Sequence, residues 1–400
     1  MKTTPWQPDP DHTVSFLEFY AKQNVIPVKQ DLTDLARHFA RRDYLYRTLG
    51  LVPQFLRGRS VIEFGPGTGD NAVYTNHLQP GLYHLVDGNP ASLSAIRHKI
   101  DHGQLSRNCT LINANFIEYE CDQQFDLVIC EGCIPGQRVP GEVLKRLGRF
   151  CAPGGMLITT TSSAVSYLAE TCRQLCYPAI AMASSNFDEQ VNIAASLFGK
   201  HLAFFQCSTR SIEDWVTDNI LFHWYGVNGA DFFSIPDALH AMDDAFRFHA
   251  SSPRFFRDLR WYKTVDGNDP VNALVLEEYW AFLPALLDCR VDKEVIVANG
   301  QSADLAKNRQ IDHICQEIST IRSRIIATLS YDPLDEVIVL LDQLGRLLPP
   351  VMRQTCAGMA DFAVGIRQVA EGRLQPQPFN AFCNWWGRGQ QYLSLIKNTH

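Results

Sequence analysis

Three glycines at alternating positions, directly after a short apolar run, constrain the fold of this chain more than any other feature. The run Val61–Phe64 has the composition of a buried strand. It is followed by Gly65, Gly67 and Gly69 before a polar segment begins. Glycine at such positions lets the backbone turn sharply and lets a ligand approach without a Cβ in the way. The segment therefore predicts a strand, a tight turn and a helix, with a ligand site at the turn.

Further apolar runs of strand length are separated by gaps long enough for a helix. The early runs are Leu82–Val86, Thr110–Asn113, Phe125–Cys130 and Met156–Thr160, and two later candidates are Phe246–Ala250 and Arg260–Thr264. Apolar strands that alternate with helical segments are typical of βαβ units and of a parallel sheet covered on both faces. We therefore predict an α/β fold with a doubly wound, mostly parallel sheet of seven strands.

The rest of the chain predicts additional helical parts. We expect an N-terminal helical cap over residues 1–45, a main domain over 46–265 with a helical insertion or lid at 185–245, and a C-terminal helical module over 270–400. The clearest helical pattern lies in this module. There apolar residues recur at one-face spacing between Asp332 and Leu348, and two prolines follow.

Composition excludes several classes of function. The 400 residues include 36 Lys and Arg against 43 Asp and Glu, a net charge of −7, whereas proteins that bind nucleic acid by its backbone show a basic excess. No run approaches the roughly eighteen apolar residues of a membrane span, and the first residues lack an apolar signal segment. We therefore expect no nucleic-acid partner, no membrane span and a cytoplasmic location. In that compartment the 12 scattered cysteines are expected to be reduced and structural, and no ligand spacing requires a metal.

The charges around the glycine loop indicate what kind of ligand it holds. Glu63 stands just before the loop, Asp70 directly after it, and Asp87 ends the second predicted strand. A carboxylate at the end of that strand can accept both hydroxyls of a ribose. Acids next to the loop would repel a pyrophosphate but favour a cation. The combination predicts S-adenosylmethionine, while an NAD-type cofactor and a glycine turn that serves only helix packing remain as alternatives.

The chain also resembles the class I S-adenosylmethionine-dependent methyltransferase family. Matching elements occur in the expected order between residues 63 and 155. They are the loop Glu63–Gly69, Asp87, the pair Asn115-Phe116, the strand and turn Phe125–Gly132, and the turn Leu147–Gly155. The resemblance implies a Rossmann-like methyltransferase sheet and the same donor that the charges predict.

The resemblance implies a role for each matching residue. The glycine loop would pack against the methionine part of the donor, Asp87 would hold the ribose, and the Asn115-Phe116 pair would flank the adenine. Glu131 and Gly132 would lie beside the methyl group, and Glu63 would act on the donor's amino group directly or through water. The expected donor contacts are Glu63, Gly65, Gly67, Thr68, Gly69, Asn71, Asp87, Gly88, Asn89, Asn115, Phe116, Glu131 and Gly132.

The acceptor is less constrained by the sequence. A hydroxyl acceptor needs a general base, and Glu131 and His223 are our candidates, with a loop-fixing or donor-contacting role as the alternative for Glu131. The segment Glu131–Gln137 lacks the Asn/Asp-Pro-Pro-aromatic signature of amino-group methylation on nucleobases or glutamine. The acids and aromatics around His223 suit a sugar, but they equally suit a helix with its tryptophan in the core.

Two flanking stretches, Gln30–Tyr46 and Trp385–Leu393, resemble a bacterial methyltransferase subgroup that accompanies surface-polysaccharide biosynthesis. The second would be a cap over the pocket or a packing seam. We predict methyl transfer to a hydroxyl of a sugar, glycolipid or related small molecule, with a small-molecule or glycan acceptor as partner and a homodimer allowed for. The alternatives are an N- or O-methyltransferase of a peptide or secondary metabolite, and a non-catalytic scaffold of the same fold.

Overall fold

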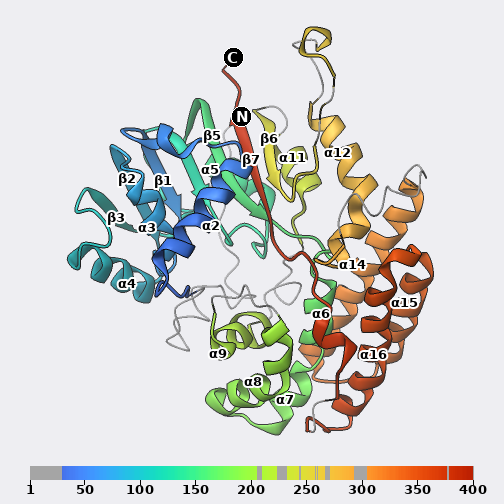
Figure 1. Cartoon of the computed structure of the whole chain (residues 1–400). Coiled ribbons are helices and arrows are strands. Elements are labelled where there is room, and N and C mark those ends of the chain that lie inside the picture. The colour runs from blue at the N-terminus through green and yellow to red at the C-terminus, as the bar shows by residue number, and fades with distance from the viewer. Residues whose placement is uncertain are drawn as a thin grey trace, which may run out of the picture.

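A computed structural model gives the structure of the chain. It describes residues 29–204, 210–222, 232–242, 245–256, 258, 260–265, 271–291, 304–375 and 378–399. Within these residues the chain forms one sheet with helices on both of its faces, and a larger set of helices packs beside it (Figure 1).

The sheet has seven strands in the order β3-β2-β1-β4-β5-β7-β6. The first five strands along the chain pair in parallel, and β7 runs antiparallel to both of its neighbours. The strands are β1 (Ser60–Phe64), β2 (Leu82–Asp87), β3 (Cys109–Asn113), β4 (Phe125–Cys130), β5 (Cys151–Thr161), β6 (Phe246–Ser252) and β7 (Gln391–Lys397). The α/β prediction of a doubly wound, mostly parallel, seven-stranded sheet is confirmed.

Helices connect and cover these strands. The α-helices are α2 (Leu35–Thr48), α3 (Asp70–His77), α4 (Pro90–Asp101), α5 (Pro140–Gly148), α6 (Leu168–Gln174), α7 (Tyr177–Ala183), α8 (Phe187–Phe204), α9 (Ile212–Val216), α11 (Ile235–Met242), α12 (Val271–Phe282), α14 (Leu305–Thr328), α15 (Leu334–Leu347) and α16 (Arg353–Ala370). Short helical turns are η1 (Pro53–Leu56), η2 (Thr217–Leu221, a π-turn), η3 (Tyr262–Thr264), η4 (Leu283–Leu287), η5 (Pro350–Met352) and η6 (Ala381–Asn384).

Alternating strand residues fill two separate cores. Val61 and Ile129 point toward α2, α3 and α4, where they pack with Tyr46 and Ala72. Their neighbours along the strands, such as Ile62, belong to the larger core on the other face, which continues through α5, α11 and the helical module. Strands buried on both faces carry near-continuous apolar runs, which is why the parallel strands were visible in the sequence.

The C-terminal module differs from its prediction. It is helical through α14, α15 and α16, but its last described segment is the strand β7, which enters the sheet between β5 and β6 (Figure 1, red strand). The expectation of helix to the end of the chain was therefore wrong. Leu393 and Leu395 are fully buried in this strand, and pairing with both neighbours satisfies its backbone.

Other boundaries also shift. The candidate strand Phe246–Ala250 is confirmed as part of β6, whereas Arg260–Thr264 is not a strand and contains the turn η3. Trp261 and Tyr262 there are largely exposed, so no sheet surface covers them. Helix α2 runs through the expected boundary between residues 45 and 46 and buries Tyr46 against α3.

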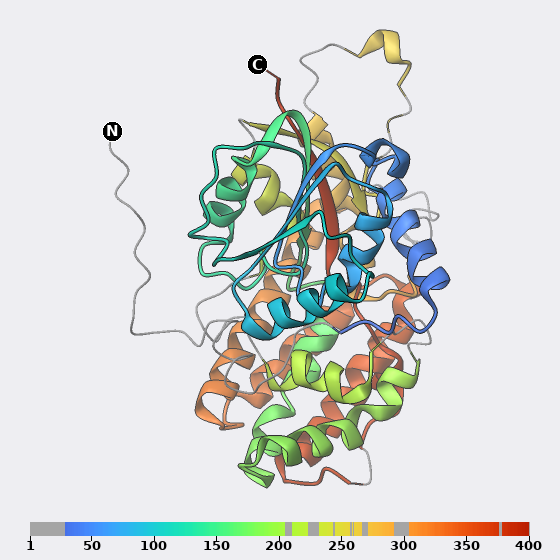
Figure 2. The same ribbon diagram turned by 90° about the vertical axis from the view of Figure 1, so that its left-hand side faces the viewer.

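The buried side chain of Arg173 connects the helical module to the segment that leads into β7. Arg173, on α6, stacks on the rings of Phe382 and Trp386, and its guanidinium donates to the carbonyl of Trp385 at 2.6 Å. Trp385 is fully buried and donates its ring N–H to the carbonyl of Leu287. The tryptophan pair is thus a packing seam rather than a cap. Figure 2 shows the yellow-green and the orange-to-red helices that gather below the sheet.

Candidate active site

The glycine loop between β1 and α3 has the backbone that its sequence predicts. Gly65, Gly67 and Gly69 have φ values of 66°, 57° and 75°, a region that L side chains rarely adopt. A Cβ on Gly65 would also lie 2.3 Å from the Sγ of Cys133. On Gly69 a Cβ would lie 3.0 Å from Ile96 on α4. The loop therefore needs glycine for its conformation and for the close approach of its neighbours.

Asp87, at the carboxyl end of β2, organises the polar rim beside this loop. One carboxylate oxygen accepts from the backbone N–H of Gly67 at 3.1 Å, and the other accepts from the N–H of Asn89 at 2.8 Å. Burial raises the pKa of Asp87 to about 6. Asn89 caps α4 through its side-chain oxygen, while its buried amide nitrogen has no partner among the described residues. Gly88, between them, is half-buried.

Glu63 lies under the loop in a fully buried position. The hydroxyl of Tyr83 donates to its carboxylate. The pKa of Glu63 is raised to about 7. Burial is the largest cause, the nearby charge of Glu131 is the second, and Asp87 adds a smaller effect in the same direction. The charges of Glu131 and Asp87 thus both oppose the ionisation of Glu63, and a further cation beside Glu63 would favour its ionised form.

Glu131 lies at the tip of β4 and is held by the N-terminal helix. Arg42, on α2, donates to both of its carboxylate oxygens, at 2.9 and 2.7 Å, and both side chains are about nine-tenths buried. Asn71, near the start of α3, donates to the same carboxylate at 3.3 Å. A two-pronged pair of this kind fixes geometry as well as charge. It connects α2, α3 and β4 at the edge of the site.

Gly132 follows directly and brings β4 and β5 together. Its φ is 75°, and its N–H donates to the hydroxyl of Thr160 at 2.7 Å. The thiol of Cys133 lies within hydrogen-bonding distance of the carbonyls of Phe64 and Glu131. The turn after β4 therefore packs directly on the end of β1.

The remaining predicted donor contacts have local roles in the structure. Thr68 donates to Asp70 at 2.6 Å, and Asp70 pairs with Lys99 at 2.8 Å at the start of α3. Asn115 accepts from the N–H of Ile117 at 3.0 Å, and the half-buried Phe116 packs against the main core. Thr68, Asn115 and Phe116 all follow carboxyl ends of parallel strands, so the topology gathers them at one edge of the sheet.

One predicted site residue cannot be placed. His223 lies outside the described residues. The sequence did not predict the hydrogen-bond partners of three site residues. They are Arg42 for Glu131, Tyr83 for Glu63 and Thr160 for Gly132. Arg42 stands 89 positions before Glu131, and no local pattern links such distant residues.

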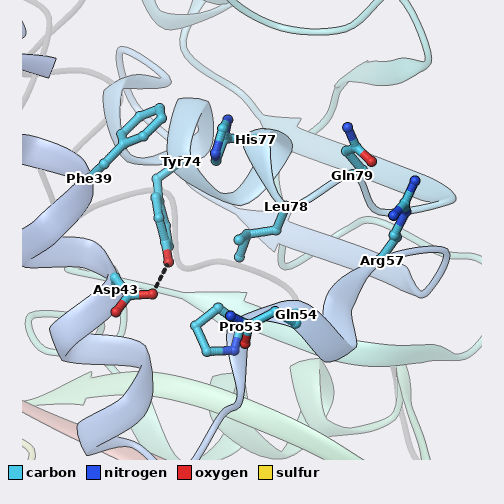
Figure 3. A pocket seen from close by; sticks show the side chains of 9 residues that line it. All are labelled: Phe39, Asp43, Pro53, Gln54, Arg57, Tyr74, His77, Leu78 and Gln79. Carbon is cyan, nitrogen blue, oxygen red and sulfur yellow. Dashed lines mark hydrogen bonds between the residues drawn. The ribbon is translucent and has the colours of Figure 1, made fainter. Parts of the chain in front are cut away.

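A separate open cleft of about 520 Å³ lies between α2, η1 and α3. Phe39, Asp43, Tyr74 and His77 line it, and the hydroxyl of Tyr74 donates to Asp43 at 3.0 Å (Figure 3). This cleft contacts the carboxyl end of α3, whereas the glycine loop precedes the amino end of the same helix. It is therefore distinct from the loop site.

The residues at the loop fit S-adenosylmethionine. Glycines without Cβ atoms leave room for close approach, neighbouring carboxylates favour a cation, and the unpartnered amide of Asn89 can bind a polar ligand atom. Among the described residues, no group of three or more His, Cys, Asp or Glu side chains is arranged to hold a metal. No helix of the described residues has the length and apolar character of a membrane span.

Comparisons with known proteins agree with this site. Residues 56–204 match the family model described as a methyltransferase domain. That region runs from η1 to the end of α8 and contains the glycine loop and the ends of all five parallel strands. No curated protein sequence matches the chain.

Solved structures with partial similarity include three methyltransferases. The CcbJ methyltransferase from Streptomyces caelestis is 21% identical, with a TM-score of 0.27, and the match covers 31% of this chain and 51% of CcbJ. The N-methyltransferase NodS from Bradyrhizobium japonicum, bound to S-adenosylhomocysteine, is 13% identical, with a TM-score of 0.30. The match covers 36% of this chain and 74% of NodS. PKMT2 from Rickettsia typhi, also with S-adenosylhomocysteine, is 15% identical, with a TM-score of 0.40. The match covers 60% of this chain and 49% of PKMT2. The match thus spans about half the length of CcbJ and of PKMT2.

The glycine loop, its carboxylates and the sheet order define a methyltransferase domain of the Rossmann-like class. The family match assigns the character of a methyltransferase domain to residues 56–204, and the residues at the glycine loop within it fit S-adenosylmethionine.

Proposed function

We propose that the chain transfers the methyl group to a hydroxyl of a sugar, glycolipid or related small molecule. The observation that carries this acceptor class is the end of β5. Residues Thr159–Ser163 are consecutive hydroxyl-bearing residues, and all are buried at the strand end that adjoins Gly132. Within this run the hydroxyl of Ser162 has no partner among the described residues, and an uncharged hydroxyl that can both donate and accept suits a neutral hydroxylated molecule.

We assign the donor contacts to the residues named at the loop. Asp87 and Asn89 would hold the ribose side, the Asn115-Phe116 pair the adenine, and the glycine loop with Glu63 the amino-acid part. When bound, S-adenosylmethionine supplies a methyl group on a positively charged sulfur for in-line displacement. The protein's own contribution is alignment, since a fixed attack geometry removes much of the entropic barrier.

Glu131 is best suited to a positioning role. Both of its oxygens accept from Arg42 and one of them also from Asn71, so the protein itself fixes the orientation of this carboxylate. We propose that the Arg42–Glu131 pair fixes the turn beside the methyl group. This agrees with the loop-fixing alternative for Glu131, and it leaves His223 as the remaining candidate base.

Calorimetric titration with S-adenosylmethionine tests the donor site. Gly65→Ala should weaken binding at least about tenfold, because the added Cβ strains a left-handed residue and meets Cys133. Gly58→Ala is the matched control: Gly58 has a φ of 75° but nothing within 4 Å of the added Cβ. Its donor affinity should stay unchanged. Absence of binding by the unmodified chain at millimolar ligand would refute the donor assignment.

The acceptor class is tested with a panel of methyl glycosides, free hydroxylated metabolites and short peptides. We expect S-adenosylhomocysteine to form only with hydroxylated small molecules. Exclusive turnover of peptides would favour the alternative acceptor. Light scattering of the same samples tests whether the active species is the homodimer that we propose as an option.

A further inference from the structure

We propose that Ser162 and Gln390 form a binding subsite for the hydroxyl groups of the acceptor, next to Gly132. The inference rests on the donor site proposed above, because Gly132 is the residue expected beside the methyl group. It adds something that the donor residues do not supply, namely the side chains that would orient the incoming nucleophile.

Ser162 lies directly after β5, two residues beyond Thr160. Ser162 directly follows the last residue of β5, and if the alternation of the strand continues by one position it shares a face with Thr160, whose hydroxyl accepts from the N–H of Gly132 at 2.7 Å. Ser162 is fully buried, and its hydroxyl has no hydrogen-bond partner within the described part of the chain. A buried hydroxyl left without a partner costs stability, so it marks a position where a polar ligand atom would be accommodated.

Gln390, which directly precedes β7, also lies close to Gly132. The last pair of the antiparallel ladder joins Thr161 to Gln391, so the next position sets Ser162 opposite Gln390. The side-chain nitrogen of Gln390 lies 3.9 Å from the position that a Cβ on Gly132 would occupy. Gln390 is half-buried, and the structure gives its amide no partner among residues 29–399 that are described.

The backbone that carries Gln390 is held firmly. Gly389 donates its N–H to the carbonyl of Ser166 at 3.0 Å, and a Cβ on Gly387 would lie 2.0 Å from that same oxygen. Arg388 donates to the carbonyl of Val291 at 2.7 Å, which ties the segment to the helical module. A rigid support of this kind presents a side chain in one position, which a specificity residue requires.

The chemistry of the two side chains indicates the ligand class. A hydroxyl and an amide carry no charge, and together they offer donors and acceptors. The subsite therefore fits a neutral polyhydroxylated molecule such as a glycoside, rather than an anion.

The test uses the full chain with Ser162→Ala, Gln390→Ala and both together. Gln343→Ala, at an exposed glutamine on α15, is the matched control. Binding of methyl α-glucoside, galactoside, mannoside and rhamnoside is followed by saturation-transfer NMR in the presence of S-adenosylhomocysteine. Steady-state kinetics then give KM and kcat for the glycoside that binds best. Each single variant should weaken glycoside binding and raise its KM about three- to tenfold, and the double variant more, as expected for lost hydrogen bonds.

The affinity for S-adenosylhomocysteine separates this inference from the proposed function. It should stay unchanged in all variants. An unmodified chain that fails to bind S-adenosylhomocysteine speaks against the donor site itself. A chain that binds it normally but binds no glycoside of the panel overturns the hydroxyl subsite alone. The same conclusion follows if the double variant keeps the glycoside affinity of the unmodified chain, or if its loss is matched by an equal loss of donor affinity.

Discussion

The carboxyl groups under the glycine loop are placed where ionisation is unfavourable without a cation. Burial raises the pKa of Glu63 to about 7 and that of Asp87 to about 6. A carboxyl group with a raised pKa stabilises the folded chain in its protonated form, so this contribution falls as the pH rises from the ordinary pKa to the raised one. For Glu63 this stabilising contribution is lost as the pH rises from 4.5 to about 7.

Binding of the cationic donor should reverse this penalty, and its affinity should therefore rise with pH. We expect the donor affinity to increase between pH 5.5 and 7.5, by up to about tenfold per pH unit wherever one proton is released on binding. Calorimetry in buffers of different ionisation enthalpy measures the released protons directly. Glu63→Gln cannot release a proton, so its affinity should depend less on pH. An equal dependence in both proteins would show that Glu63 does not respond to the donor.

At the scale of elements, the site depends on a helix that precedes the sheet. Arg42 connects α2 to the tip of β4 through its pair with Glu131. One turn further along α2, the hydroxyl of Tyr46 forms a hydrogen bond of 2.6 Å with the hydroxyl of Thr75 on α3. Helix α2 therefore does more than cover the domain, because its side chains complete the polar layer under the glycine loop. It belongs with the methyltransferase sheet rather than with a separate cap.

Removal of Arg42 should be costly because it leaves Glu131 buried without its partner. We expect Arg42→Ala to lower the free energy of unfolding by about 3–5 kcal/mol, measured by urea denaturation. The control is Arg47→Ala on the same helix, which removes an exposed pair with Asp43 and should leave the denaturation midpoint nearly unchanged. A double variant with Glu131→Gln should recover part of the loss. If Arg42→Ala and Arg47→Ala behave alike, the pair does not fix the turn.

The elements also show what the sequence could predict. Five parallel strands and the glycine loop were visible, since buried strands and left-handed glycines leave strong local signals. Strand β7 was not predicted, although Leu393 and Leu395 alternate as in a strand, because its support comes from partners far away in sequence. The Arg42–Glu131 pair escaped prediction for the same reason. Local patterns do not contain the long-range contacts that complete this site.

At the scale of the whole molecule, the helical module and the sheet are parts of one folding unit. The chain leaves the sheet after β6, forms the module, and returns through the buried Trp385 to β7. The expected boundary near residue 270 therefore does not separate two independent domains, because β5 and β6 both need β7 as a partner.

A chain that ends at Gln390 should lack this partner. We expect it to aggregate or to lose its cooperative thermal transition, because two strands would expose unpaired edges. A chain that ends at Asn398 keeps β7 and should melt like the unmodified protein, as followed by circular dichroism. Cooperative melting of the shorter chain at the same temperature would mean that β7 is dispensable for the sheet.

The position of β7 also sets an order of events during synthesis. Strand β6 leaves the ribosome long before its only strand partner in the sheet, since the whole helical module is translated between the two. At a typical rate of about 5–20 residues per second, the edge of β5 and all of β6 wait several seconds for that partner. The donor loop, built from earlier strands, can form during this interval. A nascent chain can therefore complete the glycine loop and its carboxylates while the strands on the other side of the sheet are still unpaired.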